Sequence, residues 1–349
     1  MTQATTAAEL SPEEIARIAK LRYVNDDEPG FTRKLNGRGF KYLNAQGRLV
    51  RDKNQTVRIE TLAIPPAWTE VWICRFANGH LQATGHDDRG RKQYLYHDHW
   101  REISNAAKFW RLKSCPKLLP ALRRQVASDL RGSELSRTRV LAGMVALLDH
   151  TSIRVGNEEY VRDNGSYGLS TLRTRHVQIK GGKAMLRFRA KSGLHREAEV
   201  TEKRLVRVLK QLNNLPGAHV FQFRDDAGEV HAADATAVNA YLDERTGQHF
   251  TAKDFRTWKG SSLAAGILFE ERSLEVVADR KKVVKRAIAA VSEALGNTPT
   301  TCRKYYIHSG LLESYLAGKF PQLFARFRPT AKRSLSRDEQ ILGRFLRQT

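Results

Sequence analysis

Two adjacent tyrosines, Tyr305 and Tyr306, end a basic stretch that reads TTCRKYYIH over residues 300–308. Buried aromatic residues seldom occur as a pair that follows charged residues, so one of these phenols is a candidate nucleophile. A tyrosine hydroxyl can form a covalent intermediate when neighbouring groups activate it. The alternative is that both tyrosines are ordinary core or surface residues.

Four further sites carry side chains suited to binding an anion. They are Arg154 in SIRVGNEEY (152–160), Lys191 after a predicted hairpin, Lys253 and Arg256 in KDFRTW (253–258), and Asn297 in LGNTP (295–299). Lys253 and Arg256 would share one face of a helix. Guanidinium groups present planar pairs of donors that match phosphate oxygens. A single arginine in so basic a chain is usually solvated, so the joint pattern carries the interpretation.

The charge of the chain indicates a polyanionic partner. Among 349 residues, 60 lysines and arginines face 37 aspartates and glutamates, a formal net charge of +23. Nucleic acid is the first candidate, because each neutralised phosphate releases counterions and adds affinity. An anionic membrane would favour a basic amphipathic helix, whereas this charge is spread over the whole chain. A basic protein without a polyanionic partner is the remaining alternative.

Several other classes are disfavoured. The longest apolar run, VLAGMVALL (140–148), is much shorter than the roughly 18 residues of a membrane span, and the N-terminus lacks signal-peptide features. Three cysteines without metal-like spacing fit a reducing cytoplasm. No phosphate-binding loop of the G-x-x-x-x-G-K-[ST] type occurs, so ATP use through such a loop is not expected. HDHWRE (97–102) offers two histidines but no third ligand, so no metal site is predicted.

The first hundred residues predict a flexible tail over 1–14 and a β-rich domain over 15–100. SPEEIARIAKL (11–21) should open a helix, with Ser11 as its cap, Pro12 in its first position and Glu14 completing a capping box. Short alternating runs then predict strands. These runs are GFKYL (39–43), LVRD (49–52), VRIETLAI (57–64), EVWICRF (70–76), HLQATG (80–85) and KQYLYH (92–97).

The rest of the chain predicts a mainly helical domain over 105–325, followed by a basic tail over 326–349. Apolar residues at helical spacing predict a helix over 136–150. HVQIK (176–180) and KAMLRFRA (183–190), joined by two glycines, predict a hairpin. A long helix over 273–295, with Val277, Val284, Ile288, Val291 and Leu295 on its apolar face, should stop at Gly296. A new helix from Thr298 should carry Tyr306.

These sites, in this order and spacing, resemble the type IB DNA topoisomerases in their compact bacterial and poxvirus form. The resemblance covers about residues 15–320 and includes ATGHDDRGRKQYLYH (83–97), which is similar to a GRxQYxY segment of the family. The active tyrosine of the family closes an S-K-x-x-Y motif, which aligns here with Cys302–Tyr306 and departs at its Ser and Lys positions. The tyrosine also lies nine positions after the polar residue of L-G-[HN]-T, which is Asn297 here. Both alignments select Tyr306 over Tyr305.

The resemblance implies a role for each site. Tyr306 would attack a DNA phosphodiester, Arg154 and Arg256 would bind its non-bridging oxygens, and Lys191 would protonate the leaving 5′-oxygen. Asn297, in a position where many relatives have histidine, would donate one amide N–H, and Lys253 would support the general acid. The implied DNA contacts are Gln93, Tyr94, Tyr96 and Tyr160. The chemistry requires such groups, because negative charge builds up on the phosphate and no metal is expected to neutralise it.

The expected protein is therefore an α+β enzyme in which a β-rich cap and a helical catalytic domain close as a clamp around double-stranded DNA. It should act as a cytoplasmic monomer at the bacterial nucleoid, relax supercoils of either sign, and need neither ATP, metal nor membrane. A tyrosine recombinase is the first alternative, although recombinases have H-x-x-R where this chain has Lys253-x-x-Arg256 and lack such a cap. A non-catalytic architectural DNA-binding protein is the second.

Overall fold

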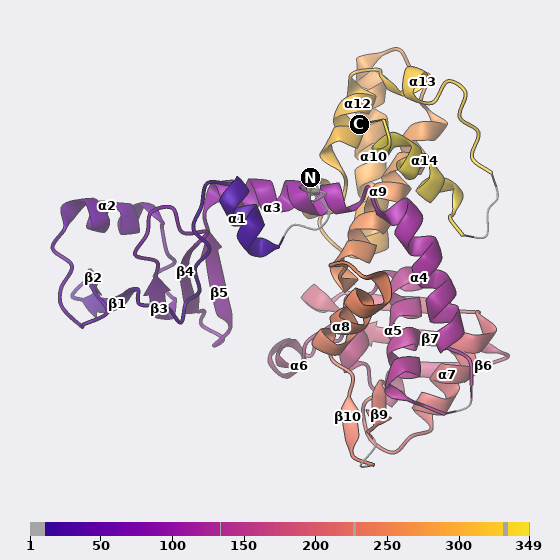
Figure 1. Cartoon of the computed structure of the whole chain (residues 1–349), viewed down its shortest axis with the longest axis horizontal. Helices are drawn as coiled ribbons and strands as arrows, with labels where there is room; N and C mark the ends of the chain where they lie inside the picture. The colour runs from indigo at the N-terminus through magenta and orange to yellow at the C-terminus, as the bar shows by residue number, and fades with distance from the viewer. Residues whose placement is uncertain (1–10, 133, 226–227, 331–333, 349) are drawn as a thin grey trace, which may run out of the picture. The chain divides into compact units, whose positions relative to one another are not determined.

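The computed structural model describes residues 11–132, 134–225, 228–330 and 334–348. The chain divides into two compact units, Met1–Trp110 and Arg111–Thr349. Both combine helices with small antiparallel sheets, which agrees with the predicted α+β class (Figure 1). Each unit is described by itself.

The first unit begins with α1 (Pro12–Ile18), whose N-terminus has the predicted capping box. The Glu14 amide donates to Ser11 Oγ at 3.2 Å, and the Ser11 amide donates to the Glu14 carboxylate at 2.7 Å. Residues 11–14 therefore belong to a capped helix rather than to the predicted tail, because these two hydrogen bonds fix them. The other part of that tail, residues 1–10, lies outside the described residues.

A five-stranded antiparallel sheet forms most of the first unit, in the order β2-β1-β3-β4-β5. Its strands are β1 (Phe31–Asn36), β2 (Gly39–Leu43), β3 (Thr69–Ile73), β4 (Leu81–His86) and β5 (Lys92–Tyr96). Four of the predicted runs correspond to β2, β3, β4 and β5, whereas β1 was not recognised in the sequence. The unit ends with α3 (Asp98–Arg111), which reaches the division between the units.

Two of the predicted strands are wrong. VRIETLAI lies largely in helix α2 (Lys53–Thr61), and LVRD leads into it. The Asp52 carboxylate accepts hydrogen bonds from the amides of Asn54 and Gln55, so it caps the helix and satisfies two of the donors that a helix N-terminus leaves open. Ile59, on this helix, is buried in a cluster that includes Val71 and other residues of the sheet. That tertiary contact favours the helix over the β-propensity of the run.

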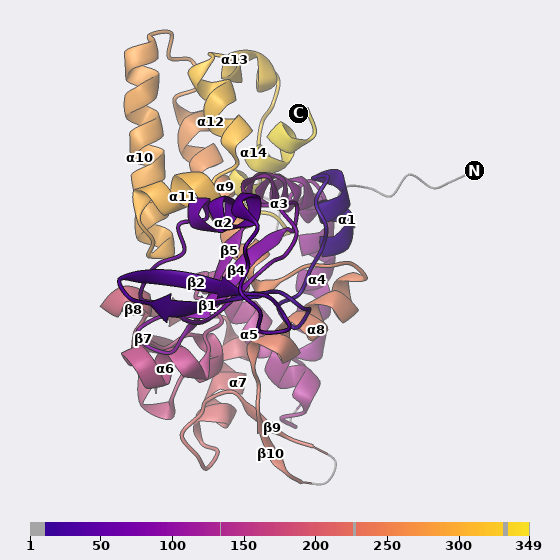
Figure 2. The ribbon, with the colours of Figure 1, turned by 90° about the vertical axis from the view of Figure 1, so that its left-hand side faces the viewer.

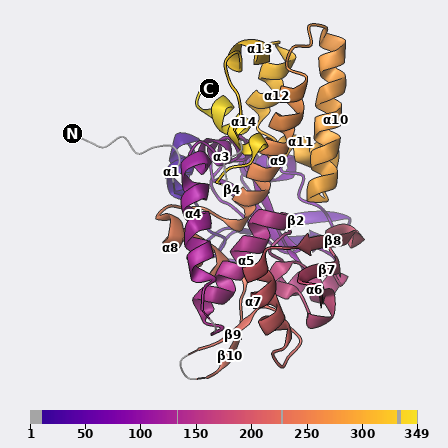
Figure 3. The ribbon, with the colours of Figure 1, turned by 90° about the vertical axis from the view of Figure 1, so that its right-hand side faces the viewer.

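The second unit contains the remaining elements. Its helices are α4 (Cys115–Asp129), α5 (Arg137–Thr151), α6 (Glu158–Asn164), α7 (Lys203–Asn213), α8 (Ala235–Thr246), α9 (Ala252–Glu270), α10 (Val277–Leu295), α11 (Pro299–Tyr305), α12 (Ser309–Leu316), α13 (Phe320–Leu323) and α14 (Arg337–Leu346). Its strands form the sheet β6-β7-β8 (Val177–Lys180, Lys183–Arg189, His195–Val200) and the pair β9 (Gln222–Arg224) and β10 (Val230–Ala232). Figures 1 and 3 show α9, α10, α12 and α14 together at the end of this unit that lies opposite the two small sheets.

The predicted hairpin and long helix are present in this unit. Strands β6 and β7 pair from Val177↔Leu186 to Lys180↔Lys183, and the alternating apolar residues of β7 are buried while its basic residues are exposed. Helix α10 stops at Gly296, which adopts a left-handed φ of 58°. The helix begins at Val277 rather than at residue 273, and Val277 itself is exposed.

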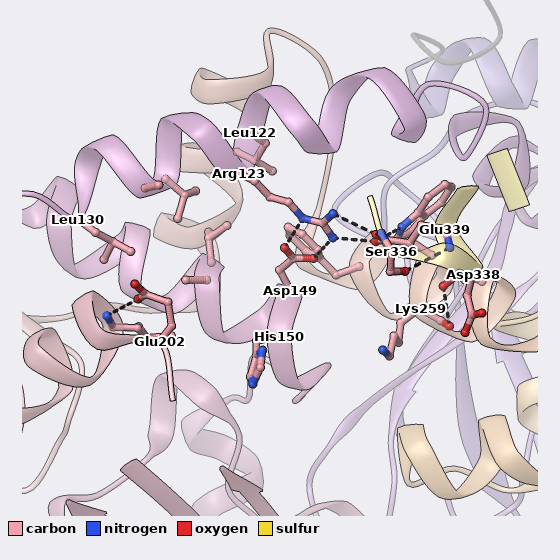
Figure 4. A pocket seen from close by; sticks show the side chains of 18 of the residues that line it. Leu122, Arg123, Leu130, Asp149, His150, Glu202, Lys259, Ser336, Asp338 and Glu339 are labelled. Carbon is pink, nitrogen blue, oxygen red and sulfur yellow. Dashed lines mark hydrogen bonds and ion pairs between the residues drawn. The ribbon is translucent and has the colours of Figure 1, made fainter. Parts of the chain in front are cut away.

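Residues 326–349, predicted only as a basic tail, contain the amphipathic helix α14. It buries Ile341, Leu342 and Phe345 and packs along α9. A polar network anchors it, because Glu339 accepts hydrogen bonds from Arg123 at 2.7 Å and from Trp258 Nε1 at 2.8 Å. Arg123 also bonds the Asp149 carboxylate, as Figure 4 shows at the edge of a pocket between α4, α5 and α9. No helix in the described ranges is both long and apolar enough to cross a membrane.

Candidate active site

Arg154 is held by a tight loop that follows α5. Helix α5 is followed by Ser152, which has a left-handed φ of 55° and caps the helix. The Arg154 carbonyl then accepts a hydrogen bond from the Leu169 amide at 2.8 Å. Two glycines make this loop possible, since a Cβ atom on Gly168 would lie 2.5 Å from Cα of Gly156. Their backbones can approach this closely only without side chains.

Arg256 lies on the buried face of α9, with 4% of its surface exposed. Its guanidinium donates to the carbonyl oxygens of Ser152 and, at 2.8 Å, Leu295, so it joins the ends of α5 and α10. The same guanidinium lies 5.2 Å from the ring centroid of Tyr306. Its Nε is buried without a hydrogen-bond partner. An unsatisfied buried donor is costly, so this nitrogen is suited to an incoming acceptor.

Asn297 follows the left-handed Gly296 at the end of α10. Arg154 donates to its Oδ1 at 2.5 Å and to the Gly296 carbonyl at 2.9 Å. Because arginine can only donate, this contact fixes the orientation of the amide and leaves the Asn297 NH₂ group facing away from it. That nitrogen is buried without a partner. Two neighbouring residues therefore present unsatisfied donors, as an anion site requires.

Tyr306 lies directly after α11, which Thr298 caps and Pro299 begins. The prediction that the helix carries Tyr306 is wrong by one residue, since the helix ends at Tyr305 and Tyr306 adopts a non-helical φ of −129°. Its carbonyl oxygen accepts a hydrogen bond from Ser261 Oγ of α9 at 3.2 Å. The neighbouring Tyr305 is 39% exposed, and its ring lies beside the Lys304 ammonium.

Lys191 is exposed in a short turn (Lys191–Gly193) between β7 and β8. Its ammonium lies 5.8 Å from the ring centroid of Tyr160 on α6. In the described part of the chain, no contact joins Lys191 to the arginines, although the preceding residue, Ala190, lines the same cavity as Arg154 and Arg256. Ser192 has a left-handed φ of 64°, so the turn depends on an uncommon backbone conformation.

The other predicted site residues, Lys253 and the residues of β5, are not among the residues that line the cavity beside Arg154 and Arg256. Lys253 is exposed in the first turn of α9. In the first unit, Gln93 donates to Asp87 at 2.9 Å, and the rings of Tyr94 and Tyr96 stack with centroids 6.1 Å apart on one face of β5. Tyr94 is exposed and Tyr96 is half-buried.

Three arginines, Arg154, Arg196 and Arg256, are among the residues that line one small cavity. Burial lowers the pKa of Arg154 to about 10, and the positive charge of Arg256 acts in the same direction. Arg196, on β8, was missed in the sequence, because nothing in its local pattern distinguishes it from the other basic residues. The three arginines concentrate positive charge around this cavity.

Comparisons with known proteins place the chain in a family. The profile described as "Eukaryotic DNA topoisomerase I, catalytic core" matches residues 97–318, and that of the "Bacterial DNA topoisomerase IB, N-terminal domain" matches residues 39–87. The chain belongs to the type IB DNA topoisomerase family. DNA topoisomerase 1B of Acanthamoeba polyphaga mimivirus is 31% identical to this enzyme over 293 residues, which are 82% of this chain and 87% of the viral protein.

More distant relatives carry related names. DNA topoisomerase 1B of vaccinia virus (strain Copenhagen) is 22% identical over 240 residues, or 66% of this chain and 70% of the viral one. DNA topoisomerase 1 of Mycosarcoma maydis is 26% identical over 220 residues, which are 57% of this chain and 21% of that protein. In the described part of this type IB enzyme, no three histidine, cysteine or acidic residues are grouped as metal ligands.

Proposed function

We propose that this enzyme relaxes positive and negative supercoils by cutting and rejoining one strand of double-stranded DNA through a 3′-phosphotyrosyl bond at Tyr306. The observation that carries the proposal is the contact of the Arg256 guanidinium with the Tyr306 ring, beside the bonded pair Arg154 and Asn297. A phenol surrounded by cations and unsatisfied donors is suited to attack on an anionic phosphodiester.

In the proposed reaction, the phenolic oxygen of Tyr306 bonds to phosphorus and the bond from phosphorus to the 5′-oxygen breaks. The phenol gives up its proton and the leaving oxygen takes one, for which Lys191 is the donor. Negative charge grows on the non-bridging oxygens. Arg154, Arg256 and the Asn297 NH₂ group supply donors for them, and their preorganisation is supported by the backbone carbonyls that hold both guanidiniums.

Resealing is the reverse of this step. The free 5′-hydroxyl attacks the phosphotyrosyl phosphorus and loses its proton, the bond from phosphorus to the Tyr306 oxygen breaks, and the phenol regains a proton. The phosphotyrosyl bond conserves the energy of the phosphodiester, so ATP is not consumed. The cationic side chains neutralise the charge of the phosphate, a role that metal ions have in other phosphoryl-transfer sites. We further propose that Lys253 supports the proton donor and that Tyr160, whose ring lies beside the Lys191 ammonium, contacts the DNA.

For the whole protein, we propose a monomeric clamp in which the β-rich cap and the helical catalytic domain close around the duplex in the bacterial cytoplasm. Gln93, Tyr94 and Tyr96 are the proposed contacts of the cap. The proposal is supported by the net charge of +23 and by the family matches in both units. Phosphate neutralisation on this scale would make binding strongly dependent on salt.

The deciding experiment is relaxation of negatively and positively supercoiled plasmid with EDTA present and ATP absent. Wild-type enzyme should relax both, and Tyr306→Phe should relax neither. Denaturant trapping followed by mass spectrometry should find the DNA adduct on Tyr306, with Tyr305→Phe as the matched control that still forms it. An adduct on Tyr305, or relaxation that persists in Tyr306→Phe, would refute the assignment. Activity only on paired specific sites would favour a recombinase.

A further inference from the structure

We propose that Arg196 is a third phosphate-binding guanidinium of this site, acting on the scissile phosphodiester together with Arg154 and Arg256. The inference rests on the proposed function. It concerns a residue on β8, outside the six positions that the family resemblance assigns to the reaction, and it follows from where the strand places this side chain.

Hydrogen bonds from Arg196 reach the C-terminal end of α10. Its guanidinium donates to the Ala294 carbonyl at 2.9 Å and to the Glu293 carbonyl at 3.4 Å. A Cβ atom on Gly296 would lie 3.7 Å from Arg196 Nη1, so the guanidinium lies beside the residue that precedes Asn297. Figures 2 and 3 show β8 close to the end of α10 from which α11 begins. Arg196 thus reaches the phosphate site from the hairpin side.

The donors of Arg196 are only partly used. A guanidinium has five N–H groups, and the two observed hydrogen bonds leave the others available. The side chain is half-buried and lines the cavity that also contains Arg154 and Arg256. Arg256, a lining residue of the same cavity, also has an unsatisfied donor, its buried Nε.

The charges in this cavity are not compensated by the protein. Within the described ranges, Arg154, Arg196 and Arg256 bond carbonyl and amide oxygens, and none of them forms an ion pair. Burial lowers the pKa of Arg196, and the charge of Arg256 lowers it further. Three like charges held together without a carboxylate are unfavourable until an anion enters, and a phosphodiester is the anion that this enzyme family handles.

A purely structural role is the competing explanation, since cations near a helix C-terminus stabilise it through the carbonyls. The two roles differ in what they require. Capping needs a hydrogen-bond donor, which a neutral glutamine also provides. Phosphate stabilisation needs the positive charge. Arg196→Gln therefore separates them, and Arg196→Lys keeps the charge with fewer donors.

The test measures single-turnover formation of the Tyr306–DNA adduct on two oligonucleotide duplexes. One carries a normal scissile phosphate and the other a neutral methylphosphonate at the same position. On the normal phosphate, Arg196→Ala and Arg196→Gln should slow adduct formation roughly 10- to 100-fold, and Arg196→Lys should lose less. On the methylphosphonate, the loss should shrink to less than about threefold, because little anionic charge remains to be stabilised. Arg187→Ala, an exposed arginine paired with Glu197 on the same sheet, is the control.

Each outcome decides the inference. Equal losses on both duplexes, or wild-type rates for Arg196→Gln, would refute a charge role and leave Arg196 as a cap of α10. Thermal melting of every variant shows whether a loss of cleavage rate comes from unfolding. If Arg196→Ala does not fold, Arg196→Gln is used for the comparison in its place. If wild-type enzyme forms no adduct at Tyr306, the proposed function itself fails and this inference falls with it. If the wild-type enzyme forms the adduct and the Arg196 variants form it at the same rate, this inference fails and the proposed function stands.

Discussion

The carbonyl oxygen of Tyr306 lies 2.6 Å from the point where a Cβ atom would stand on Gly260. No side chain fits there without moving the backbone of the proposed nucleophile, and Val291 and Leu295 close the same space at 3.2 Å. Gly260 lies in the middle of α9, where glycine is otherwise an unfavourable choice. Its presence allows the segment of Tyr306 to rest directly on the helix that carries Arg256.

Gly260→Ala should therefore slow adduct formation roughly 10- to 100-fold, because small displacements of a nucleophile have large effects on rate. Single-turnover cleavage of a DNA duplex measures the effect. The matched control is Gly143→Ala in α5, another buried helical glycine, whose Cβ atom would meet its nearest neighbour, Val208, at 3.4 Å. That variant should keep its cleavage rate. Unchanged cleavage in Gly260→Ala would show that the contact does not position Tyr306.

Asn297→Asp should lose more activity than Asn297→Ala. The carboxylate would still accept the hydrogen bond from Arg154, but it would replace the NH₂ donor by a second anionic oxygen next to the phosphate site. We expect a loss of roughly 100- to 1,000-fold in the cleavage rate of Asn297→Asp. Asn297→His restores a donor and should retain most of the activity. A fully active Asn297→Asp enzyme would rule out donation by the amide.

Arg256→Ala should impair both catalysis and stability. The guanidinium is buried between two carbonyl groups, and its removal leaves the Ser152 and Leu295 oxygens without these hydrogen bonds. We expect the free energy of unfolding to fall by about 1–3 kcal/mol and adduct formation by roughly 100-fold or more. Urea denaturation and single-turnover cleavage measure the two effects separately. A stable, inactive variant would assign Arg256 to the reaction alone.

Glu339→Ala should destabilise the catalytic unit by about 2–3 kcal/mol, because it leaves the buried Trp258 N–H and part of the Arg123 guanidinium without an acceptor. Thermal melting or urea denaturation measures this loss. The control is Arg337→Ala, also on α14, whose ion pair with Glu270 is exposed and should contribute less than about 1 kcal/mol. If the two substitutions lowered the free energy of unfolding by similar amounts, the buried network would not contribute more to stability than the exposed ion pair.

Stability should fall in acid because of His308. Burial, aided by the charge of Lys113, lowers the pKa of His308 to about 4, from a usual value of 6.5. Between these two pH values the unfolded chain binds a proton that the folded chain does not, so the free energy of unfolding decreases as the pH falls. The loss should reach roughly 3 kcal/mol near pH 4 and then level off for this group. Urea denaturation at several pH values should show a flatter profile for His308→Gln, and parallel profiles would contradict the assignment.

Local signals predicted much of the structure. The capping box at Ser11, the alternation along β7 and the stop at Gly296 each depend on neighbours in the chain, and each is present. Helix α2 was misread because a run with β-branched residues fits both a strand and a helix, and the burial of Ile59 decides between them. Helix α14 had a usable signal, since its apolar residues recur at helical spacing.

The site could be predicted in part. The positions of Arg154, Arg256, Asn297 and Tyr306 were selected by motif, and the fold brings these four residues together. Arg196 could not be selected in this way. Its place in the cavity depends on the pairing of β7 with β8 and on the end of α10, which are far apart in the sequence. Such contacts are created by tertiary structure and leave no pattern in the neighbouring residues.

Arg256 and Ser261, whose hydroxyl donates to the Tyr306 carbonyl, lie about one and a half turns apart on the same helix, α9. A displacement of this helix carries both groups along, so thermal motion leaves their separation nearly constant. Lys191 is mounted differently, on a short turn with a left-handed Ser192. In the proposed reaction, the rate of strand cleavage would then depend on how often this turn brings the Lys191 ammonium to the leaving oxygen.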